Sequence, residues 1–350
     1  MSARAWCDVF RRATASFVAR ARRDVDAHAD ARERERCADA FADAFEATLV
    51  AVERAEDGGE RACRAAAEGL GPWTGANCLE LCRARDGLLR SHGFYDCFAS
   101  VKGEENASAM RALGGVLARC DAREDDEARL LAVVRGVFAG NIFDLGAAAS
   151  TDLFEKAGVD FERTVETLRP RPWCVDDFDA LRARFRTTRH KKAIVFVDNA
   201  GADVCLGMIP FVRELLRRGT EVVMAANETP SINDVTAREL REHIWPALIE
   251  LGDATLCDAI ASGRLRVVSS GSDMPVIDLR YLSPEVCAEA ADADLVVLEG
   301  MGRGIETNLF AKFKIDALKL AMIKHEEVAT LLNGKLYDCV CKFDVGSEAA

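Results

Sequence analysis

The first third of the chain carries apolar residues at helical spacing. Up to about residue 135, Ala, Arg, Glu and Leu dominate and β-branched residues are rare. Both features predict helices, because β-branched side chains lose rotamer freedom in a helix and apolar positions three and four residues apart fall on one helix face. Glycines predict breaks at Asp57–Gly59, at 69–75 and around Gly103.

The first 23 residues are rich in Arg and Ala and poor in acidic residues. Organelle transit peptides and amphipathic helices share this composition. Val9, Phe10, Phe17 and Val18 would form one apolar side, Ser and Thr are sparse, and acidic residues follow at once. We therefore expect an amphipathic helix.

The pattern changes near residue 190, where short β-branched runs begin to alternate with helical segments. A helix is expected at 204–218, with Gly219 suited to its C-terminal end. Thr236 and Glu239 have the spacing of a capping box that starts another helix. The expected strands are 193–197, 221–226, 265–269, 295–298, 318–323 and 336–343.

Strands that alternate with helices and have no polar face predict a parallel sheet covered on both sides. The expected fold is therefore a three-layer α/β/α arrangement with a largely parallel, doubly wound sheet, preceded by a helical subdomain. The segment between 170 and 190 is basic and contains two prolines, which suits a junction. We expect a helical unit at 1–170 and an α/β unit at 190–346.

Composition excludes several classes of function. The net charge of −12 over 350 residues argues against a general nucleic-acid binder and against adhesion to anionic membranes. No apolar run approaches the roughly 20 residues of a membrane span. The 13 cysteines are odd in number, scattered, and form no CxxC pair, so reduced thiols in a cytoplasmic protein are expected, and not zinc or a disulfide framework.

Polar side chains follow five successive strands of the predicted sheet. In open parallel sheets, ligands bind beyond the carboxyl ends of the strands. Carboxylate and amide oxygens at this edge suit Mg²⁺ or Mn²⁺, and arginine, lysine and glycine suit a phosphate ester. The residues concerned are Asp198, Asn199 and Gly201, then Asn227, Asn233 and Asp234, then Ser269, Ser270 and Asp273, then Glu299, Gly300, Gly302 and Arg303, and finally Lys324.

Each of these residues also has an ordinary structural interpretation. Asp198 and Asn199 suit a turn after a strand, and a single arginine or lysine is usually a surface charge. Asp234 lies two residues outside the capping box that Thr236 starts, which modestly favours a ligand role. The functional hypothesis depends on the convergence of the residues and on none of them alone.

Other sequence motifs fit poorly. The glycines at 300–304 loosely resemble a dinucleotide-binding turn, but the third glycine is misplaced and no strand-terminal acid lies at the expected distance. The same loop is the only feature that supports an S-adenosylmethionine-dependent carboxyl methyltransferase. Asp198 has no second aspartate two positions later, which argues against a haloacid-dehalogenase-type phosphatase.

Three separated motifs resemble those of the metal-dependent damage-control phosphatases. They are the segment 197–203 (Val-Asp-Asn-Ala-Gly-Ala-Asp), the segment 233–236 (Asn-Asp-Val-Thr) and the loop 299–303 (Glu-Gly-Met-Gly-Arg). The similarity also includes Asn106 and the segment 140–146 (Gly-Asn-Ile-Phe-Asp-Leu-Gly). The loop is similar to that of a subgroup with stand-alone plant members and the C-terminal domain of a pantothenate kinase paralogue.

The resemblance implies a site and an activity. Asp198, Asn199 and Asp234 would hold Mn²⁺, Co²⁺, Ni²⁺ or Mg²⁺. Asn141 and Asp144 would face the metal from the helical part, across a cleft between that part and the sheet. Asp203, Glu299, Gly300, Gly302, Arg303 and Lys324 would surround the phosphate.

The substrate would be a small phosphorylated metabolite, with 4′-phosphopantetheine and its oxidised or damaged forms favoured. A sugar phosphate, or a non-catalytic module that binds a phosphorylated metabolite, stays open as an alternative. Asp203 and Asp234 are candidate bases for positioning water. Whether water or a carboxylate such as Asp198 attacks the phosphorus is left open.

Overall fold

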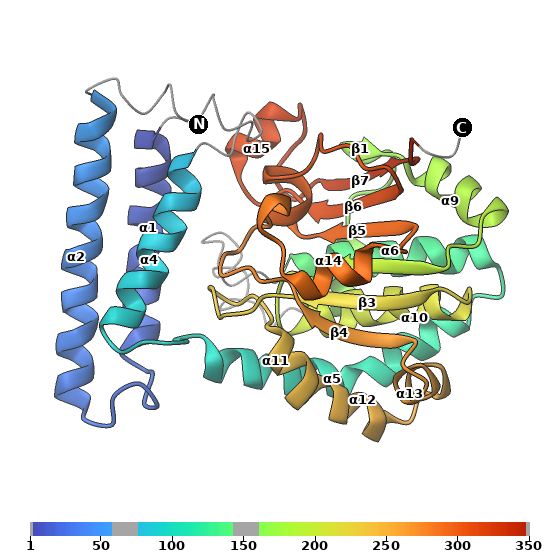
Figure 1. Ribbon diagram of the computed structural model, residues 1–350, viewed down its shortest axis with the longest axis horizontal. Helices are drawn as coiled ribbons and strands as arrows, with labels where there is room; N and C mark the ends of the chain where they lie inside the picture. The colour runs from blue at the N-terminus through green and yellow to red at the C-terminus, as the bar shows by residue number, and fades with distance from the viewer. Residues whose placement is uncertain (1–2, 58–75, 143–160, 348–350) are drawn as a thin grey trace.

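The structure, a computed structural model, describes residues 3–57, 76–142 and 161–347. Its centre is a seven-stranded sheet in the order β1-β7-β6-β5-β2-β3-β4 (Figure 1). Every neighbouring pair is parallel except β6 and β7. The strands are β1 (Val175–Asp176), β2 (Lys192–Phe196), β3 (Glu221–Ala226), β4 (Leu265–Ser269), β5 (Leu295–Glu299), β6 (Asp316–Met322) and β7 (Cys339–Asp344).

The predicted α/β fold with a largely parallel sheet is confirmed, and the six predicted strands are present. Two details differ. The last strand, β7, runs antiparallel to β6. The two-residue strand β1 lies inside the segment expected to be a junction and pairs with β7, so this segment contributes to the edge of the sheet.

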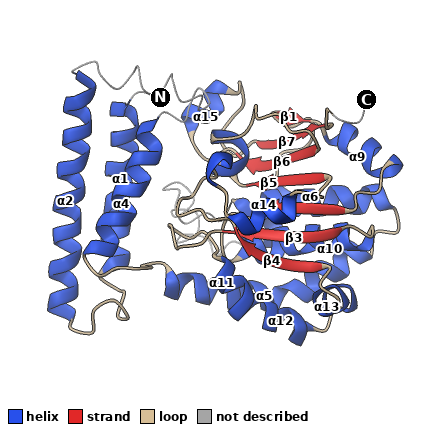
Figure 2. Ribbon diagram, viewed as in Figure 1, coloured by secondary structure: helices blue, strands red, loops and turns tan. Residues whose placement is uncertain are grey.

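Alternate residues of the central strands enter two different hydrophobic layers, because successive side chains point to opposite faces of a sheet. In β2, Ala193 and Val195 join the larger core, whereas Ile194 and Phe196 join the smaller one. All five residues of β2 are buried, which is typical of a parallel sheet covered on both faces. Figure 2 shows helices on both sides of the strands.

The larger core is closed by most of the helices. They are α5 (Ala99–Asp121), α6 (Asp126–Asn141), α8 (Phe161–Thr167), α9 (Phe178–Thr187), α10 (Ile209–Arg217), α12 (Trp245–Leu251) and α13 (Ala254–Ala261). The opposite face is covered by α14 (Pro284–Ala290), and α15 (Glu326–Leu331) belongs to a small cluster beside β6 and β7.

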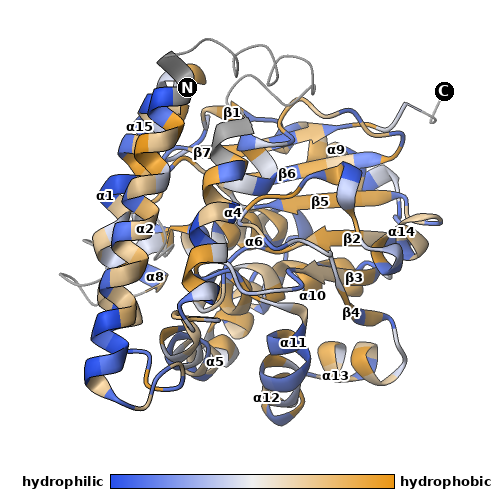
Figure 3. Cartoon of the chain, turned by 60° about the vertical axis from the view of Figure 1, so that its left-hand side comes forward, coloured by the Kyte–Doolittle hydropathy of each residue, from blue (hydrophilic) through white to orange (hydrophobic). Residues whose placement is uncertain are grey.

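Three helices form a second, separate hydrophobic cluster. They are α1 (Ala3–Ala21), α2 (Ala31–Asp57) and α4 (Ala76–Ser91), and they lie side by side at one end of the sheet (Figure 1). The amphipathic N-terminal helix is confirmed, with Phe10 and Phe17 buried and Val9 and Val18 packed against the same cluster. In Figure 3 hydrophobic colour runs along the strands, whereas α1 and α2 mix hydrophilic and hydrophobic residues.

The division into units at 1–170 and 190–346 stays a prediction. The packing shows that α5 and α6 share the core of the sheet, and that the separate cluster ends near Phe98. Among the described residues, no helix is both long and apolar enough to cross a bilayer. Eleven cysteines whose side chains the structure describes are free.

Two local predictions need correction and one is confirmed. Gly103 lies inside α5 and does not break it. The interruption between helices comes earlier, before Ala99. The helix expected at 204–218 begins as a π-helix, η1 (Asp203–Met208), before α10 continues it. Thr236 and Glu239 form the predicted capping box at the start of α11 (Ala237–Glu239).

Glycines allow α6 and η1 to pack with their backbones in close contact. A Cβ atom on Gly140 would lie 2.9 Å from Asp203 Cα and 3.0 Å from Ala202 O. A Cβ atom on Gly207 would lie 3.2 Å from Val137 Cα. Since backbone atoms cannot rotate away, a side chain at Gly140 would force the two elements apart, and one at Gly207 would be tight against α6.

We expect Gly140→Ala to destabilise the protein by about 1–3 kcal/mol, because the added methyl group would push the end of α6 away from η1. Urea unfolding measures the change. Gly136→Ala on the same helix is the control, since its Cβ atom would meet Leu206 O at 3.7 Å, an ordinary contact, and alanine favours a helix. Equal stability of the two variants would contradict this account of the packing.

A buried ion cluster ties β6 to α9 and to the C-terminal segment. The carboxylate of Asp316 accepts hydrogen bonds from Arg184 Nε at 2.7 Å, from His190 Nε2 at 2.8 Å and from Gly346 N at 3.0 Å. Burial raises the pKa of Asp316, but these hydrogen bonds outweigh it and hold the pKa below its usual range.

A lowered pKa means that the charged form of Asp316 stabilises the fold above the pKa of the unfolded chain, and that this stability is lost as the pH falls through the lower folded pKa. Asp316→Asn should therefore lower the free energy of unfolding at pH 7 by about 1–2 kcal/mol. The difference from wild type should shrink as the pH falls below about 4. Urea unfolding at several pH values tests this, with the exposed Asp43→Asn of α2 as control.

Candidate functional site

Acidic side chains from neighbouring parallel strands meet at the carboxyl edge of the sheet. Asp198 lies two residues beyond the end of β2 and Glu299 ends β5, and these two strands pair. Asp198 N donates a hydrogen bond to Glu299 Oε2 at 2.8 Å. Asp203 opens η1 on the loop that leaves β2. One carboxylate oxygen from each of these three buried residues lies within 4.8 Å of the others.

Asn141, the last residue of α6, holds this acidic cluster together. Its Nδ2 atom lies 2.9 Å from Asp203 Oδ2, 2.9 Å from Glu299 Oε1 and 3.3 Å from Asp198 Oδ2. Its Oδ1 atom accepts a hydrogen bond from Met322 N at 3.3 Å, which fixes the orientation of the amide. Because the amide nitrogen carries two hydrogens, it satisfies at most two of the three carboxylates at a time.

Burial and mutual repulsion oppose the ionisation of the acidic cluster. Burial and the nearby charge of Asp198 raise the pKa of Asp203 to about 6, against the opposing effect of Lys324. Burial and the charges of Asp203 and Asp198 raise the pKa of Glu299 well above its usual range. Asp203 Oδ1 is buried and has no hydrogen-bond partner among the described residues. A hard divalent cation fits this donor set, because it would compensate the charge and accept oxygen ligands.

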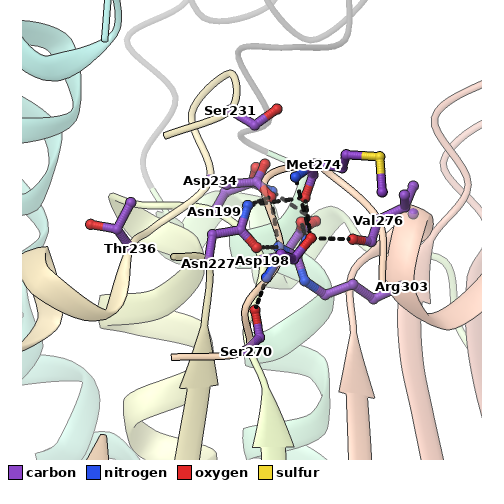
Figure 4. Close-up of polar contacts among 12 residues, drawn as sticks. Asp198, Asn199, Asn227, Ser231, Asp234, Thr236, Ser270, Met274, Val276 and Arg303 are labelled. Atoms are coloured by element: carbon purple, nitrogen blue, oxygen red, sulfur yellow. Dashed lines mark hydrogen bonds and ion pairs between the residues drawn. The ribbon is translucent and has the colours of Figure 1, made fainter. Parts of the chain in front are cut away.

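Arg303 links the acidic cluster to Asp234. It lies in the π-helix η4 (Met301–Glu306) after β5 and is 1% exposed. Its guanidinium pairs with Asp198 and, through Nη2, with Asp234 Oδ2 at 2.6 Å and Asn227 Oδ1 at 3.0 Å. Figure 4 shows the guanidinium entering this group of polar side chains from a different element than Asp198 and Asn227.

Asp234 is fixed beside the end of β2 by its backbone and its side chain. It forms an isolated bridge with Asn199, and Val235 N donates to Asp198 O at 2.9 Å. Asn227 Nδ2 donates to Asp234 Oδ2 at 3.0 Å. The capping box at Thr236 begins the next helix, so Asp234 is left to face Arg303 and Asn227.

The loop after β2 is fixed from α5, and a glycine makes room for Asp198. Gly201 N donates to Asn106 Oδ1 at 2.6 Å. Gly300 has φ of 95°, a region that side chains strongly disfavour. A Cβ atom there would also overlap the carboxylate of Asp198. Gly300 is therefore required where β5 ends against the site.

A pocket opens beside Asp198, Asn199 and Asp234. Gly302 also lines it, and a Cβ atom on Gly302 would overlap the carbonyl of Pro275. The opposite wall comes from α1, so the pocket lies between the helices at the end of the sheet and the carboxyl edge of the strands.

The structure brings most of the predicted residues into one buried network. Asp198, Asn199, Asp203, Asp234, Asn141, Glu299 and Arg303 are joined by direct hydrogen bonds or ion pairs. Lys324 is buried after β6 and acts on Asp203 electrostatically. Asp144 lies outside the described residues. The individual roles of these residues as ligands or catalytic groups stay predictions.

Sequence reasoning gave one site residue no specific role, and it missed two pocket residues and the pocket-facing side of one helix. Asn227 was noticed only as a strand-end residue, although it bonds both Asp234 and Arg303. Glu306 and His325 line the pocket, and no motif marked them. Helix α1 was recognised by its apolar stripe, but a stripe of this kind predicts a core and gives no sign that it faces a pocket.

Known proteins resemble the chain over almost its full length. The model of the damage-control phosphatase ARMT1-like domain matches residues 9–340. The damage-control phosphatase At2g17340 of Arabidopsis thaliana is 46% identical over 339 residues, which cover 97% of this chain and 87% of that protein. The mouse 4′-phosphopantetheine phosphatase is 34% identical over 75% of this chain and 38% of its own length.

One further sequence relative and one solved structure are also similar to the chain. Pantothenate kinase 2 of Arabidopsis thaliana is 44% identical over 77% of this chain, and the match spans 32% of that protein. A solved DUF89 family protein from Pyrococcus horikoshii has the same fold, with a TM-score of 0.58 at 20% identity over 94% of this chain and 96% of that one. Together with the family model, the relatives show that this chain belongs to the family of damage-control phosphatases with an ARMT1-like domain.

Proposed function

We propose that the chain is a divalent-metal-dependent phosphatase that hydrolyses small phosphomonoesters, with 4′-phosphopantetheine and its oxidised or damaged forms as substrates. The observation that carries the proposal is the buried acidic cluster with Arg303 and Lys324 beside an open pocket. Family membership supports the reaction class, and the similarity to the mouse 4′-phosphopantetheine phosphatase supports the substrate.

The proposed metal ligands are Asp198, Asn199 and Asp234, which line the pocket. When bound, Mn²⁺, Co²⁺, Ni²⁺ or Mg²⁺ would act as a Lewis acid on the phosphoryl group. Oxygen ligands accept all four of these ions. Asp203 and Glu299 adjoin Asp198 and would add negative charge that strengthens cation binding.

The cationic side chains would neutralise the negative charge of the phosphate. Arg303 donates to Asp198 and Asp234. Its guanidinium therefore lies beside two of the proposed metal ligands, where the oxygens of a phosphate would approach. A planar guanidinium can bind two phosphate oxygens at once, and Lys324 would add a point charge. Phosphoryl transfer depends mainly on such positioning and charge compensation.

One carboxylate oxygen is suited to hold the attacking water. Asp203 Oδ1 has no hydrogen-bond partner in the described part of the chain, so it can accept a proton from a water molecule. Asp234 is the second candidate. The free thiols support the prediction of a reducing compartment such as the cytoplasm.

A panel of phosphomonoesters tests the substrate assignment. We expect the highest kcat/KM with 4′-phosphopantetheine, lower values with fructose 6-phosphate, and loss of activity with a chelator that excess Mn²⁺, Co²⁺, Ni²⁺ or Mg²⁺ restores. Full activity in the chelator would contradict metal dependence. Binding of the esters without turnover would favour a non-catalytic binding module.

We expect Asp198→Asn and Asp234→Asn each to lower kcat/KM by about 10²–10³, because each removes a charged oxygen from the proposed metal site while keeping the size of the side chain. Steady-state assays at saturating metal measure the loss, and calorimetry with Mn²⁺ alone should show weaker binding. Asp258→Asn on the exposed side of α13 is the matched control. Wild-type activity in both site variants would overturn the ligand assignment.

A further inference from the structure

One wall of the pocket comes from α1 and is almost entirely apolar. Trp6, Val9, Phe10, Ala13 and Phe17 line it. These positions recur at intervals of three and four residues, so they lie on one face of the helix. Below, this set of five residues is called the α1 wall.

The α1 wall faces the polar side of the same pocket. Asp198, Asn199 and Asp234 line that side. A phosphomonoester with its phosphate at the polar side would therefore extend its alcohol part toward α1. Apolar carbon atoms would gain from contact with such a wall, whereas the hydroxyl groups of a compact sugar would lose hydrogen bonds to water without replacement.

Trp6 gives the α1 wall one specific polar group. The side chain is 5% exposed, and its Nε1 atom has no hydrogen-bond partner among the described residues. The indole ring is held edge-on by Phe10, with the ring centroids 6.5 Å apart. A buried N–H group without a partner is costly, and a carbonyl or hydroxyl oxygen of a ligand that reaches the edge of the indole ring would satisfy it.

Two residues of the α1 wall are only partly buried in the hydrophobic cluster of α1, α2 and α4. Trp6, Phe10 and Phe17 are buried in it, whereas Val9 and Ala13 are only partly buried and pack at its margin. Contacts at Val9 and Ala13 are therefore available to a ligand without rearrangement of the core.

From these observations we propose that the α1 wall determines substrate specificity. It selects a phosphomonoester whose alcohol is a flexible chain with apolar carbons and an amide or hydroxyl oxygen that accepts from Trp6 Nε1, over a compact polyol phosphate. This inference deepens the proposed phosphatase function and depends on it for the reaction, but the binding of the chain is a separate property of the pocket.

Ala13→Gln tests the α1 wall by filling the pocket on the α1 side. Ala15→Gln is the matched control, because Ala15 is on the same helix and exposed. We expect Ala13→Gln to lower the ratio of kcat/KM for 4′-phosphopantetheine to that for phosphoethanolamine about tenfold, since the longer chain meets the added side chain. The ratio should be unchanged in Ala15→Gln.

Trp6→Phe tests the indole donor, because it removes the N–H group and keeps an aromatic ring. The KM for 4′-phosphopantetheine should rise about threefold to tenfold, which corresponds to one lost neutral hydrogen bond. The KM for phosphoethanolamine and the kcat for both esters should change less. The Tm of the variant reports any loss of packing separately.

Calorimetry with pantetheine, which lacks the phosphate, separates the two proposals. Binding to wild type and Ala15→Gln that is lost in Ala13→Gln supports the α1 wall, even if no ester is hydrolysed and the phosphatase proposal fails. No binding, or equal binding to all three proteins, overturns the α1 wall even if turnover is observed. Equal loss of kcat/KM for both esters in Ala13→Gln also overturns it.

Discussion

The constraint on which this site depends is the compensation of buried negative charge. Asp198, Asp203 and Glu299 are buried within reach of one another, and burial together with mutual repulsion opposes their ionisation. Arg303, Lys324 and the amide of Asn141 offset part of that cost. A site with a surplus of acidic oxygens that the protein itself does not neutralise is suited to bind a cation.

Several segments far apart in the sequence have to meet for this compensation to work. Asn141 reaches the acidic cluster only because Gly140 lets α6 approach the backbone of η1. Gly300 makes room for Asp198 at the end of β5. The fold therefore uses small residues at backbone contacts so that polar side chains can converge.

Helix α1 serves the hydrophobic core and the pocket with the same face. Phe10 and Phe17 belong to the cluster with α2 and α4 and also line the pocket. In the proposed function, the sheet edge would supply the groups that bind the phosphate, whatever its alcohol. Helix α1 would supply an apolar surface, so under this proposal the phosphate and the remainder of the substrate would be bound by different parts of the chain.

The sequence by itself determined the strands and the edge at which the site lies. Continuous apolar runs marked β2, β3, β4 and β5, and parallel strands bring their carboxyl ends to one edge, so Asp198, Asp234 and Arg303 were expected together. Only the tertiary structure decided the direction of β7, the pairing of β1, the contacts of Asn141 with three carboxylates and the position of α1 across the pocket. These depend on contacts between residues far apart in the chain, and a local pattern of polar and apolar residues specifies which face is buried but not what it is buried against.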